Sequence, residues 1–253
     1  MREIAIELSG ISKSFGPVQA NKDINLSVES GTIHGIVGEN GAGKSTLMSI
    51  LYGFYMPDEG AMRVFGEPLD FNSSEKAIEA GIGMVHQHFM LGEPFTVLEN
   101  IILGAEGGFM LSGAMRSARE TLLDLSERYG LTVNPDAVIS SLPVGVQQRV
   151  EILKALYRGA KVLILDEPTG VLTPQEADAL FDILRSLKEQ GTTILLITHK
   201  LHEIMDVTDR VSVIRRGEMV GHRETAETSP EELAEMMVGR KVLLEVDKAP
   251  AQP

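Results

Sequence analysis

Runs of apolar residues along the chain predict a parallel β-sheet. Residues 33–37 and 162–165 are mostly or wholly apolar, and 194–197 repeat the pattern. Such short continuous runs are typical of parallel strands that are covered on both faces. Residues 83–87 indicate a further short buried strand, which ends in polar groups. We therefore expect an α/β protein with an open sheet at its core.

Alternation of apolar and polar residues predicts antiparallel strands in other parts of the chain. Residues 4–8 and 24–28 alternate or nearly alternate, with a Gly-Pro pair in the stretch between them. Residues 61–65 are followed by Gly-Glu-Pro and predict another edge strand and turn, and 210–220 predict a hairpin. An antiparallel region should accompany the parallel sheet.

Between about residues 95 and 155 the apolar period becomes helical. Helices are expected at 97–103, 116–129 and 144–158, the last opened by Ser-Ser-Leu-Pro with proline at its first position. A short final helix should run from its cap Ser229 to Val238. The chain thus carries a helical insertion. Its breaks are expected at Gly107-Gly108 and Ser112-Gly113, and the buried face of its second helix at Leu122, Leu123 and Leu125.

A glycine-rich stretch joins the first apolar run to a helical segment. Residues 38–45 have the pattern Gly-x-x-x-x-Gly-Lys-Ser. Glycines let backbone N–H groups curl around a polyanion, and a helix N-terminus adds partial positive charge. Lys44 should reach the β- and γ-phosphates of a nucleotide, and Ser45 should ligate Mg²⁺. The alternative is an ordinary turn with a surface lysine, but the flanking strand and helix favour a phosphate-binding loop.

Polar residues follow the other predicted parallel strands. Asp166 and Glu167 follow one apolar run, His199 follows another, and Gln87 ends the short strand. Open α/β sheets place ligands beyond the carboxyl ends of their strands, so these residues are candidates for one site. Asp166 should hold hydrated Mg²⁺, and Glu167 should lie where a water is polarised.

Three side chains near these motifs have two possible roles each. Phe15 precedes the first turn, where its ring could stack on adenine or pack under the sheet. His86 and His88 could hold a metal, but no third ligand is visible nearby. We prefer solvated or packed imidazoles for both histidines.

Composition and charge narrow the class of protein. The chain has 253 residues, 43% of them hydrophobic, which is ordinary for a globular protein that buries a full core. A formal charge of −13 disfavours nucleic acid as the main partner. The absence of cysteine rules out disulfides and suits a cytosolic protein. We expect no signal peptide or membrane span, so any role at a membrane should come through a partner.

Taken together, the motifs resemble the ATP-binding subunit of an ABC transporter over essentially the whole chain. The resemblance implies a P-loop NTPase (RecA-like) core with an antiparallel β subdomain and an inserted α-helical subdomain. The matching ATP-binding positions are Phe15 and Val18 in the aromatic loop, and Gly38, Glu39, Asn40, Gly41, Ala42, Gly43, Lys44, Ser45 and Thr46 in Walker A. Further along come Gln87 of the Q-loop, the signature Leu142, Pro143, Val144, Gly145 and Val146, Walker B at 162–167, the D-loop at 170–173 and the switch histidine His199.

Within that family the chain is similar to simple-sugar and nucleoside importers. The similar stretches are 86–90, 142–153 and 236–240. Those ATPases usually carry two nucleotide-binding halves in one chain, so the resemblance implies an amino-terminal half. Its expected parts are a nucleotide-binding domain at 1–245, a helical insertion at about 92–157 and a linker-like tail at 246–253.

The resemblance also implies a mechanism and partners. Two halves would sandwich two ATP molecules, each between the Walker A of one half and the signature of the other. Glu167, His199, Lys44 and Gln87 would act in catalysis, with Mg²⁺ on Ser45, Gln87 and Asp166. Transmembrane permease subunits would dock on the helical insertion at the cytoplasmic face of the membrane. An extracytoplasmic solute-binding protein would complete the system.

Two positions depart from the family pattern. The usual Leu-Ser-Gly-Gly-Gln signature is Leu-Pro-Val-Gly-Val here, so a serine hydroxyl and the N–H of residue 143 are missing as donors to a γ-phosphate. The D-loop ends in Thr173, where aspartate is common. The composite site that uses this signature is therefore expected to be the weaker of two.

Three other functions remain open at this point. A soluble ATPase of the same type that acts on ribosomes or DNA shares Walker A, Walker B and signature, although the acidic charge disfavours it. A small-molecule P-loop kinase is disfavoured by the matches at 142–146 and His199. A module that binds ATP without hydrolysis is disfavoured by Glu167.

Overall fold

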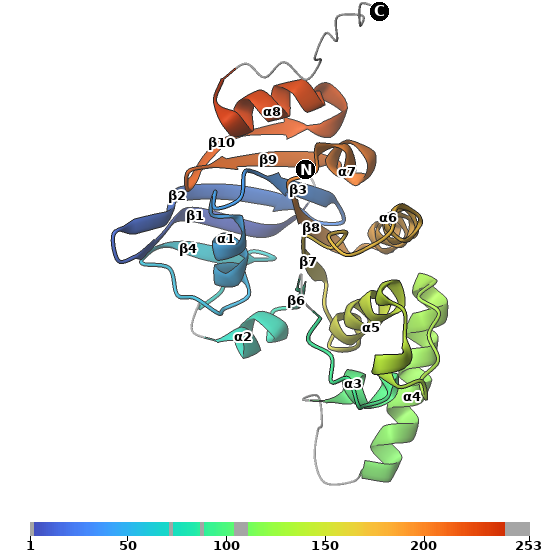
Figure 1. The fold of residues 1–253 in the computed structure, drawn as a ribbon. Helices are drawn as coiled ribbons and strands as arrows, with labels where there is room; N and C mark the ends of the chain where they lie inside the picture. The colour runs from blue at the N-terminus through green and yellow to red at the C-terminus, as the bar shows by residue number, and fades with distance from the viewer. Residues whose placement is uncertain (1–2, 71–72, 87–88, 104–110, 241–253) are drawn as a thin grey trace, which may run out of the picture.

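The computed structural model describes residues 3–70, 73–86, 89–103 and 111–240 (Figure 1). Its centre is a six-stranded sheet in which β9 and β10 are antiparallel and all other neighbours run parallel. The predicted parallel strands and the hairpin are confirmed. In spatial order the strands are β10 (Glu218–Glu224), β9 (Arg210–Arg215), β3 (Ile33–Val37), β8 (Thr193–Thr198), β7 (Val162–Asp166) and β6 (Ile82–Val85).

A second, four-stranded antiparallel sheet lies beside the first. Its strands, in spatial order, are β2 (Val18–Glu29), β1 (Ile4–Phe15), β4 (Glu59–Val64) and β5 (Glu67–Pro68). The predicted antiparallel strands are confirmed, but β4 is not an edge strand. The chain reverses at Phe65, where φ is +48°, and Pro68 then pairs with Arg63. The two-residue β5 takes the edge, a place that tolerates proline because no N–H is needed there.

Helices cover both faces of the central sheet. Figure 1 shows α3, α4, α5 and α6 on one side of this sheet and α8 near the end of the chain. Three of the helices, α2, α6 and α7, lie in stretches for which the sequence predicted no helix. The helices are α1 (Lys44–Leu51), α2 (Ser74–Glu79), α3 (Val97–Ile102), α4 (Leu111–Tyr129), α5 (Val144–Tyr157), α6 (Pro174–Glu189), α7 (Leu201–Val207) and α8 (Pro230–Val238).

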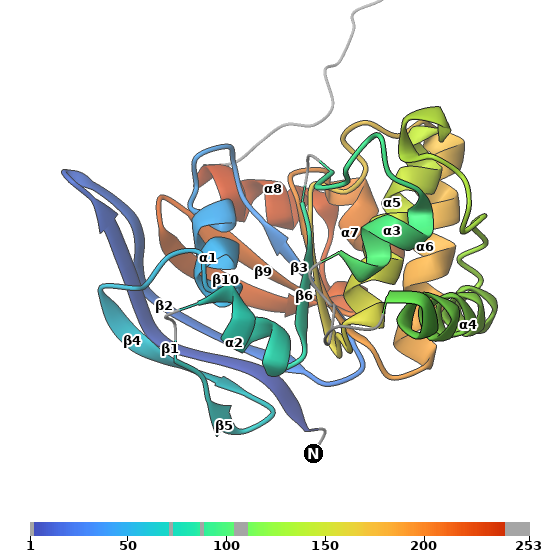
Figure 2. The same ribbon diagram turned by 90° about the horizontal axis from the view of Figure 1, so that it is seen from below.

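Alternate residues of each parallel strand enter two separate cores. Leu163 and Leu165 of β7 pack with residues of α5 and α6 on one face. Val162 and Ile164 of the same strand pack with α1 and the antiparallel sheet on the other. Figure 2 shows this layering, with the antiparallel sheet and α1 on one side of the central strands and α3 to α6 on the other. Burial on both faces explains why these strands are continuous apolar runs.

The helical insertion differs in detail from its prediction. Helix α4 begins at Leu111, so the predicted break at Ser112-Gly113 is wrong; Gly107-Gly108 lie outside the described residues. Leu122 is fully buried and Leu125 packs against the same core, but Leu123 is 47% exposed. One residue turns a helix by about 100°, so Leu123 cannot share the face of Leu122.

The boundaries of the other predicted helices agree closely with the structure. Pro143 is the N-cap of α5 rather than its first helical residue. The Ser229 side chain caps α8 as expected, accepting from the Glu232 N–H at 3.3 Å. The predicted tail at 246–253 lies outside the described residues. Among the described helices, none combines the length and apolarity needed to cross a membrane.

The contrast between two adjacent leucines of α4 provides a test of the packing. Leu122→Ala should lower the free energy of unfolding by about 2–5 kcal/mol, because it empties a fully buried site. Leu123→Ala should change it by less than about 0.5 kcal/mol, since that side chain is half exposed. Urea denaturation of both variants measures the difference, and equal losses would contradict the orientation of α4.

Candidate nucleotide site

The glycine-rich loop, residues 38–43, joins β3 to α1. At two of its positions, neighbouring backbone leaves no space for a side chain. A Cβ on Gly43 would lie 2.3 Å from the Ala20 carbonyl oxygen, and φ there is +104°. A Cβ on Gly38 would lie 2.3 Å from the Ile214 carbonyl oxygen. Glycine is required at both positions because neither backbone neighbour can move away cheaply.

Neighbouring backbone fixes this loop from outside. The Gly217 N–H donates to the Ala42 carbonyl at 2.9 Å, and the Lys22 N–H donates to the Gly217 carbonyl at 2.8 Å. The Asn21 side-chain amide donates to the Gly43 carbonyl at 3.1 Å. Strand β2 and the β9–β10 turn therefore hold the loop together.

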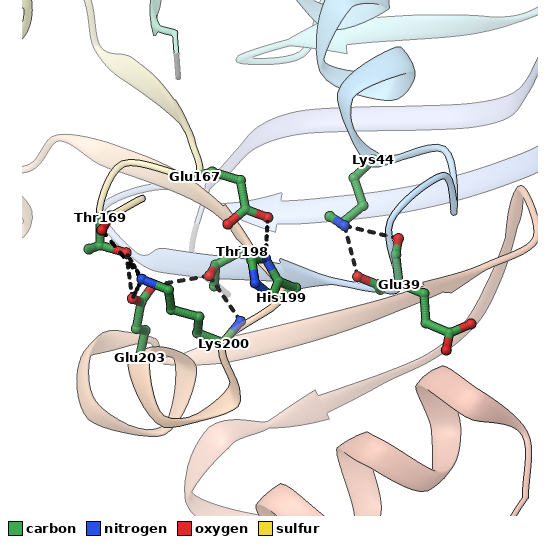
Figure 3. Close-up of polar contacts among 9 residues, drawn as sticks. Glu39, Lys44, Glu167, Thr169, Thr198, His199, Lys200 and Glu203 are labelled. Carbon is green, nitrogen blue, oxygen red and sulfur yellow. Dashed lines mark hydrogen bonds and ion pairs between the residues drawn. The ribbon is translucent and has the colours of Figure 1, made fainter. Parts of the chain in front are cut away.

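Lys44, the first residue of α1, is buried, and its side chain extends back into the loop. Its Nζ donates to the carbonyls of Gly38, at 2.8 Å, and Glu39, at 3.1 Å (Figure 3). Burial lowers the pKa of Lys44, against the opposing effect of the nearby Glu167 and Asp166 carboxylates. The ammonium is thus held by neutral carbonyls only, and a phosphate oxygen would be a stronger acceptor for it.

Asp166 ends β7 next to the first turn of α1. Burial raises the pKa of Asp166, as does Glu167, while a hydrogen bond from Ser45 and the charge of Lys44 lower it. Its Oδ1 is buried and has no hydrogen-bond partner among the residues that the structure describes. An unsatisfied carboxylate oxygen beside a hydroxyl is a donor set that suits Mg²⁺, which completes its shell with water and phosphate oxygens. These residues fit the predicted metal.

Glu167 and His199 face each other across the ends of β7 and β8. The Glu167 backbone has φ of +48°, and its N–H donates to the Ile197 carbonyl at 2.9 Å. Glu167 Oε1 lies 2.9 Å from His199 Nδ1 (Figure 3). A left-handed conformation costs about 1–3 kcal/mol outside glycine, and such strain clusters at functional sites. Here it turns the carboxylate toward the histidine.

A buried glutamate of α7 fixes the two segments that carry this pair. Glu203 is 1% exposed and accepts from the Thr198 hydroxyl at 3.0 Å. It also pairs with Lys200 at 3.1 Å, and Lys200 Nζ donates to the Thr169 hydroxyl at 2.9 Å (Figure 3). The loop after Glu167 and the segment around His199 are therefore tied to one carboxylate. Sequence reasoning missed these residues, although each lies within four positions of a predicted one.

The predicted residues surround a cavity of about 790 Å³, a volume that suits a nucleotide. Of the residues expected from the sequence, its lining includes Val18, Asn40, Gly41, Gly43, Lys44, Ser45, Thr46, Glu167 and His199. It also includes Gln19, Ala20, Gly170, Lys200, Arg216 and Gly217, which the sequence analysis did not assign to the site.

Other predicted residues lie outside this cavity. Phe15 is 43% exposed and meets the ring of Tyr55 edge to face at a centroid distance of 5.2 Å. Gln87 and His88 lie outside the described residues. His86 stacks on the ring of Phe54 at 5.6 Å, so the preferred packed imidazole is confirmed for it. The signature residues 142–146 lie at the start of α5 and do not line the cavity of their own chain.

The D-loop position that departs from the family pattern has a structural explanation. Thr173 is the N-cap of α6, and its hydroxyl accepts from the Glu176 N–H at 3.3 Å. Threonine and aspartate both supply an oxygen for this purpose, so Thr173 preserves the cap.

The fold and this site define a class of protein. A glycine-rich loop between a parallel strand and a helix, with acidic and histidine side chains from neighbouring strands, characterises P-loop nucleotide-binding proteins. The family model described as ABC transporter matches residues 21–170, more than half of the chain. The chain belongs to the ABC transporter family.

Individual relatives share most of this chain. A nucleoside import ATP-binding protein, NupA, of Lactococcus lactis subsp. cremoris is 52% identical over 99% of this chain and 50% of its own length. A glucose import ATP-binding protein, TsgD13, of Haloferax volcanii is 48% identical over 100% of this chain and 52% of its own length. The chain therefore spans about half the length of the curated relatives it matches.

Solved structures of the family have the same fold. The ADP conformation of an ATP-binding cassette of an ABC transporter superposes with a TM-score of 0.81 at 26% identity. The alignment covers 94% of this chain and 99% of that one. The expected fold class is confirmed, including the antiparallel and helical parts around the P-loop core.

The buried state of Asp166 generates a prediction on metal binding. Because burial raises its pKa, the ionised carboxylate destabilises the ligand-free fold above the usual carboxyl pKa range. Asp166→Asn should leave the ligand-free melting temperature unchanged or higher. In the native protein MgATP at about one hundred times its Kd should add about 2.7 kcal/mol, and most of the part that depends on Mg²⁺ should be lost in the variant.

Calorimetry with ATP in Mg²⁺ and in EDTA separates the metal contribution from that of the nucleotide. Equal stabilisation by Mg²⁺ in the native protein and in Asp166→Asn would place the metal elsewhere.

Proposed function

We propose that the chain is an ATP-binding and ATP-hydrolysing half of an ATPase that powers import of a nucleoside or simple sugar through a membrane ABC transporter. The pairing of Glu167 with His199 opposite Lys44 is the observation that carries the hydrolytic part of this proposal. The names of the relatives, which are import ATP-binding proteins for a nucleoside and for glucose, support the transport part. They favour import over a function on ribosomes or DNA.

Nucleotide binding follows from the loop and its surroundings. The triphosphate lies against the loop amides and the N-terminus of α1, with Lys44 transferring its hydrogen bonds from carbonyls to phosphate. Val18, which lines the cavity, would contact the base, and Phe15, its cross-strand partner at the end of β1, would stack on the base from beside the cavity. Ser45, Asp166 and Gln87 would hold Mg²⁺, which would neutralise charge on the phosphates when bound.

Hydrolysis requires a group that orients and polarises water. Glu167 presents a carboxylate at the cavity wall, and His199 fixes one of its oxygens at 2.9 Å. With Glu167 ionised, His199 Nδ1 carries the proton and donates, because a carboxylate only accepts. To donate to the γ-phosphate, Nε2 of the half-exposed histidine must carry a proton as well, so this contact requires the imidazolium form, in which both ring nitrogens donate. Lys44 stabilises the charge that develops there.

The signature has to serve another nucleotide. Residues 142–146 open α5 away from the cavity that holds Lys44 and Glu167. One P-loop and one signature form a complete pair of sites only with a second nucleotide-binding half. We propose residues 1–245 as one such domain, with 92–157 as its helical insertion and 246–253 as a linker.

A pocket between the core and the helical insertion is the proposed docking site for a permease subunit. It has a volume of about 210 Å³ and is lined by residues of the turn after α1, of α2, of β6 and of α5. Met90, 61% exposed, lies at its rim. Its N–H donates to Glu151 at 2.6 Å, and its carbonyl accepts from Lys154 at 3.0 Å. These bonds fix the backbone of Met90. Its exposed apolar side chain suits contact with a cytoplasmic loop of a transmembrane partner.

The role of Glu167 can be separated from binding. Glu167→Gln should lower turnover by about 10²–10⁴-fold and leave ATP affinity nearly unchanged, because it removes charge but keeps shape. Turnover in the assembled transporter and equilibrium ATP binding are the two measurements. Glu120→Gln, on the exposed face of α4, is the control and should change neither. Equal losses in binding and turnover would reject the assignment of Glu167.

The docking pocket predicts a separate loss. Met90→Asp should reduce association with the permease, because it introduces a charge into an apolar contact, and leave ATP binding intact. Val220→Asp, on an exposed part of β10, is the matched control. Co-purification with the permease in detergent and ATP binding by the soluble chain measure both effects. Normal assembly of Met90→Asp would exclude this surface.

A further inference from the structure

Helix α5 begins without a cap from its own segment. Its N-cap is Pro143, which has no side-chain hydrogen bond, and no acidic residue occurs in the first turn. The Pro143 carbonyl accepts from the N–H groups of Val146 and Gln147, each at 3.0 Å. In the described part of the chain, no backbone carbonyl accepts from the Val144 or Gly145 N–H. These two amides of the signature are therefore available to a side chain or a ligand.

A carboxylate from α6 reaches this helix start. Glu176 Oε2 accepts from both the N–H and the hydroxyl of Thr173, at 2.9 Å each. Its other oxygen faces α5, since a Cβ on Gly145 would lie 2.9 Å from Glu176 Oε1. Hydrogen bonds from Thr173 chiefly lower the pKa of Glu176, and the Gly145 N–H and the charge of Arg149 lower it further. Glu176 therefore caps α6, and its second carboxylate oxygen lies beside the start of α5.

A second capping box in the chain shows what is particular to Glu176. In α3, Glu99 Oε2 accepts from the Thr96 N–H at 2.7 Å and from its hydroxyl at 2.8 Å, the same arrangement as at Thr173. Only Thr96 lowers the pKa of Glu99. Both helices thus have the capping box. Of the two glutamates, only Glu176 also lies against the start of α5.

The position of this carboxylate conflicts with phosphate binding at the signature. A γ-phosphate and Glu176 are both anions, and both would use the Gly145 amide and the positive end of α5. We propose that Glu176 is a positioning residue whose carboxylate, beside the Gly145 amide, disfavours a phosphate there until the ATP of the second half displaces it. The carboxylate thereby lowers the ATP affinity of that composite site, a role that rests on the proposed function.

Displacement of Glu176 would also change the contacts at the start of α6. When Glu176 moves away from Gly145, its carboxylate keeps only the contacts with Thr173, at the end of the D-loop. The Gln148 side-chain amide, which donates to the Pro168 carbonyl at 2.8 Å, keeps α5 attached to the loop after Glu167. Occupation of the signature is thus linked to the loop that carries the carboxylate of the other site.

The test compares Glu176→Gln with Glu99→Gln in the assembled transporter that contains the second half. Closure of the two halves is followed by fluorescence against ATP concentration, and KM, kcat and melting temperature are measured in parallel. Glu176→Gln should lower the ATP concentration for half-maximal closure, and KM, by about tenfold, because it removes a like charge beside the γ-phosphate. Its kcat should change little. Glu99→Gln should alter neither value, while both variants lose similar melting temperature.

The outcomes distinguish the alternatives. Glu176 would be only a helix cap, and its proposed role would be overturned, by either of two results in a native protein that closes. One is that the two variants have equal KM and equal ATP concentrations for half-maximal closure. The other is a higher KM in Glu176→Gln. Native protein that traps no ATP between its halves would overturn the proposed function and this role with it. Glu176→Asp is the second variant if Glu176→Gln fails to fold. Its shorter side chain cannot reach Thr173 and Gly145 together, so it should also lower KM.

Discussion

Burial of the central sheet on both faces determines where chemistry can occur. Strands β3, β7 and β8 contribute apolar side chains to two cores, so a charged group within them would be desolvated without a partner. A buried polar group such as His34 of β3 needs a partner, here Ser212 at 2.7 Å, and charged groups are placed where the strands end. The carboxyl ends of neighbouring parallel strands share one edge of the sheet, and Lys44, Asp166, Glu167 and His199 meet there. The site is a consequence of the way the core is covered.

The site residues that the sequence predicted are those that follow a strand directly. Asp166, Glu167 and His199 come within one or two positions of an apolar run, and the phosphate loop is contiguous. By contrast, Arg216 and Gly217 line the same cavity from a turn that follows the phosphate loop by more than 170 residues. Glu176 meets Gly145 from another helix. No local pattern specifies such contacts, since they depend on how separate elements pack.

The fold shows the same distinction. Parallel and antiparallel strands followed from periodicity, but the edge position of β4 did not, because it depends on a two-residue strand that returns after Phe65. Leu123 was misplaced because three nearby leucines offered more apolar positions than one helix face holds. Helix α6 had a usable signal, the Thr173–Glu176 capping box ahead of Leu180 and Leu184.

The attachment of the phosphate loop to β2 and to the β9–β10 turn has an energetic consequence for the nucleotide. Hydrogen bonds from Lys22 to Gly217 and from Gly217 to Ala42 order the loop when the chain folds. The entropy of ordering is then part of the folding free energy, and ligand association does not have to supply it. Affinity for phosphate thus depends in part on hydrogen bonds of the antiparallel sheet and the hairpin that form before any nucleotide arrives.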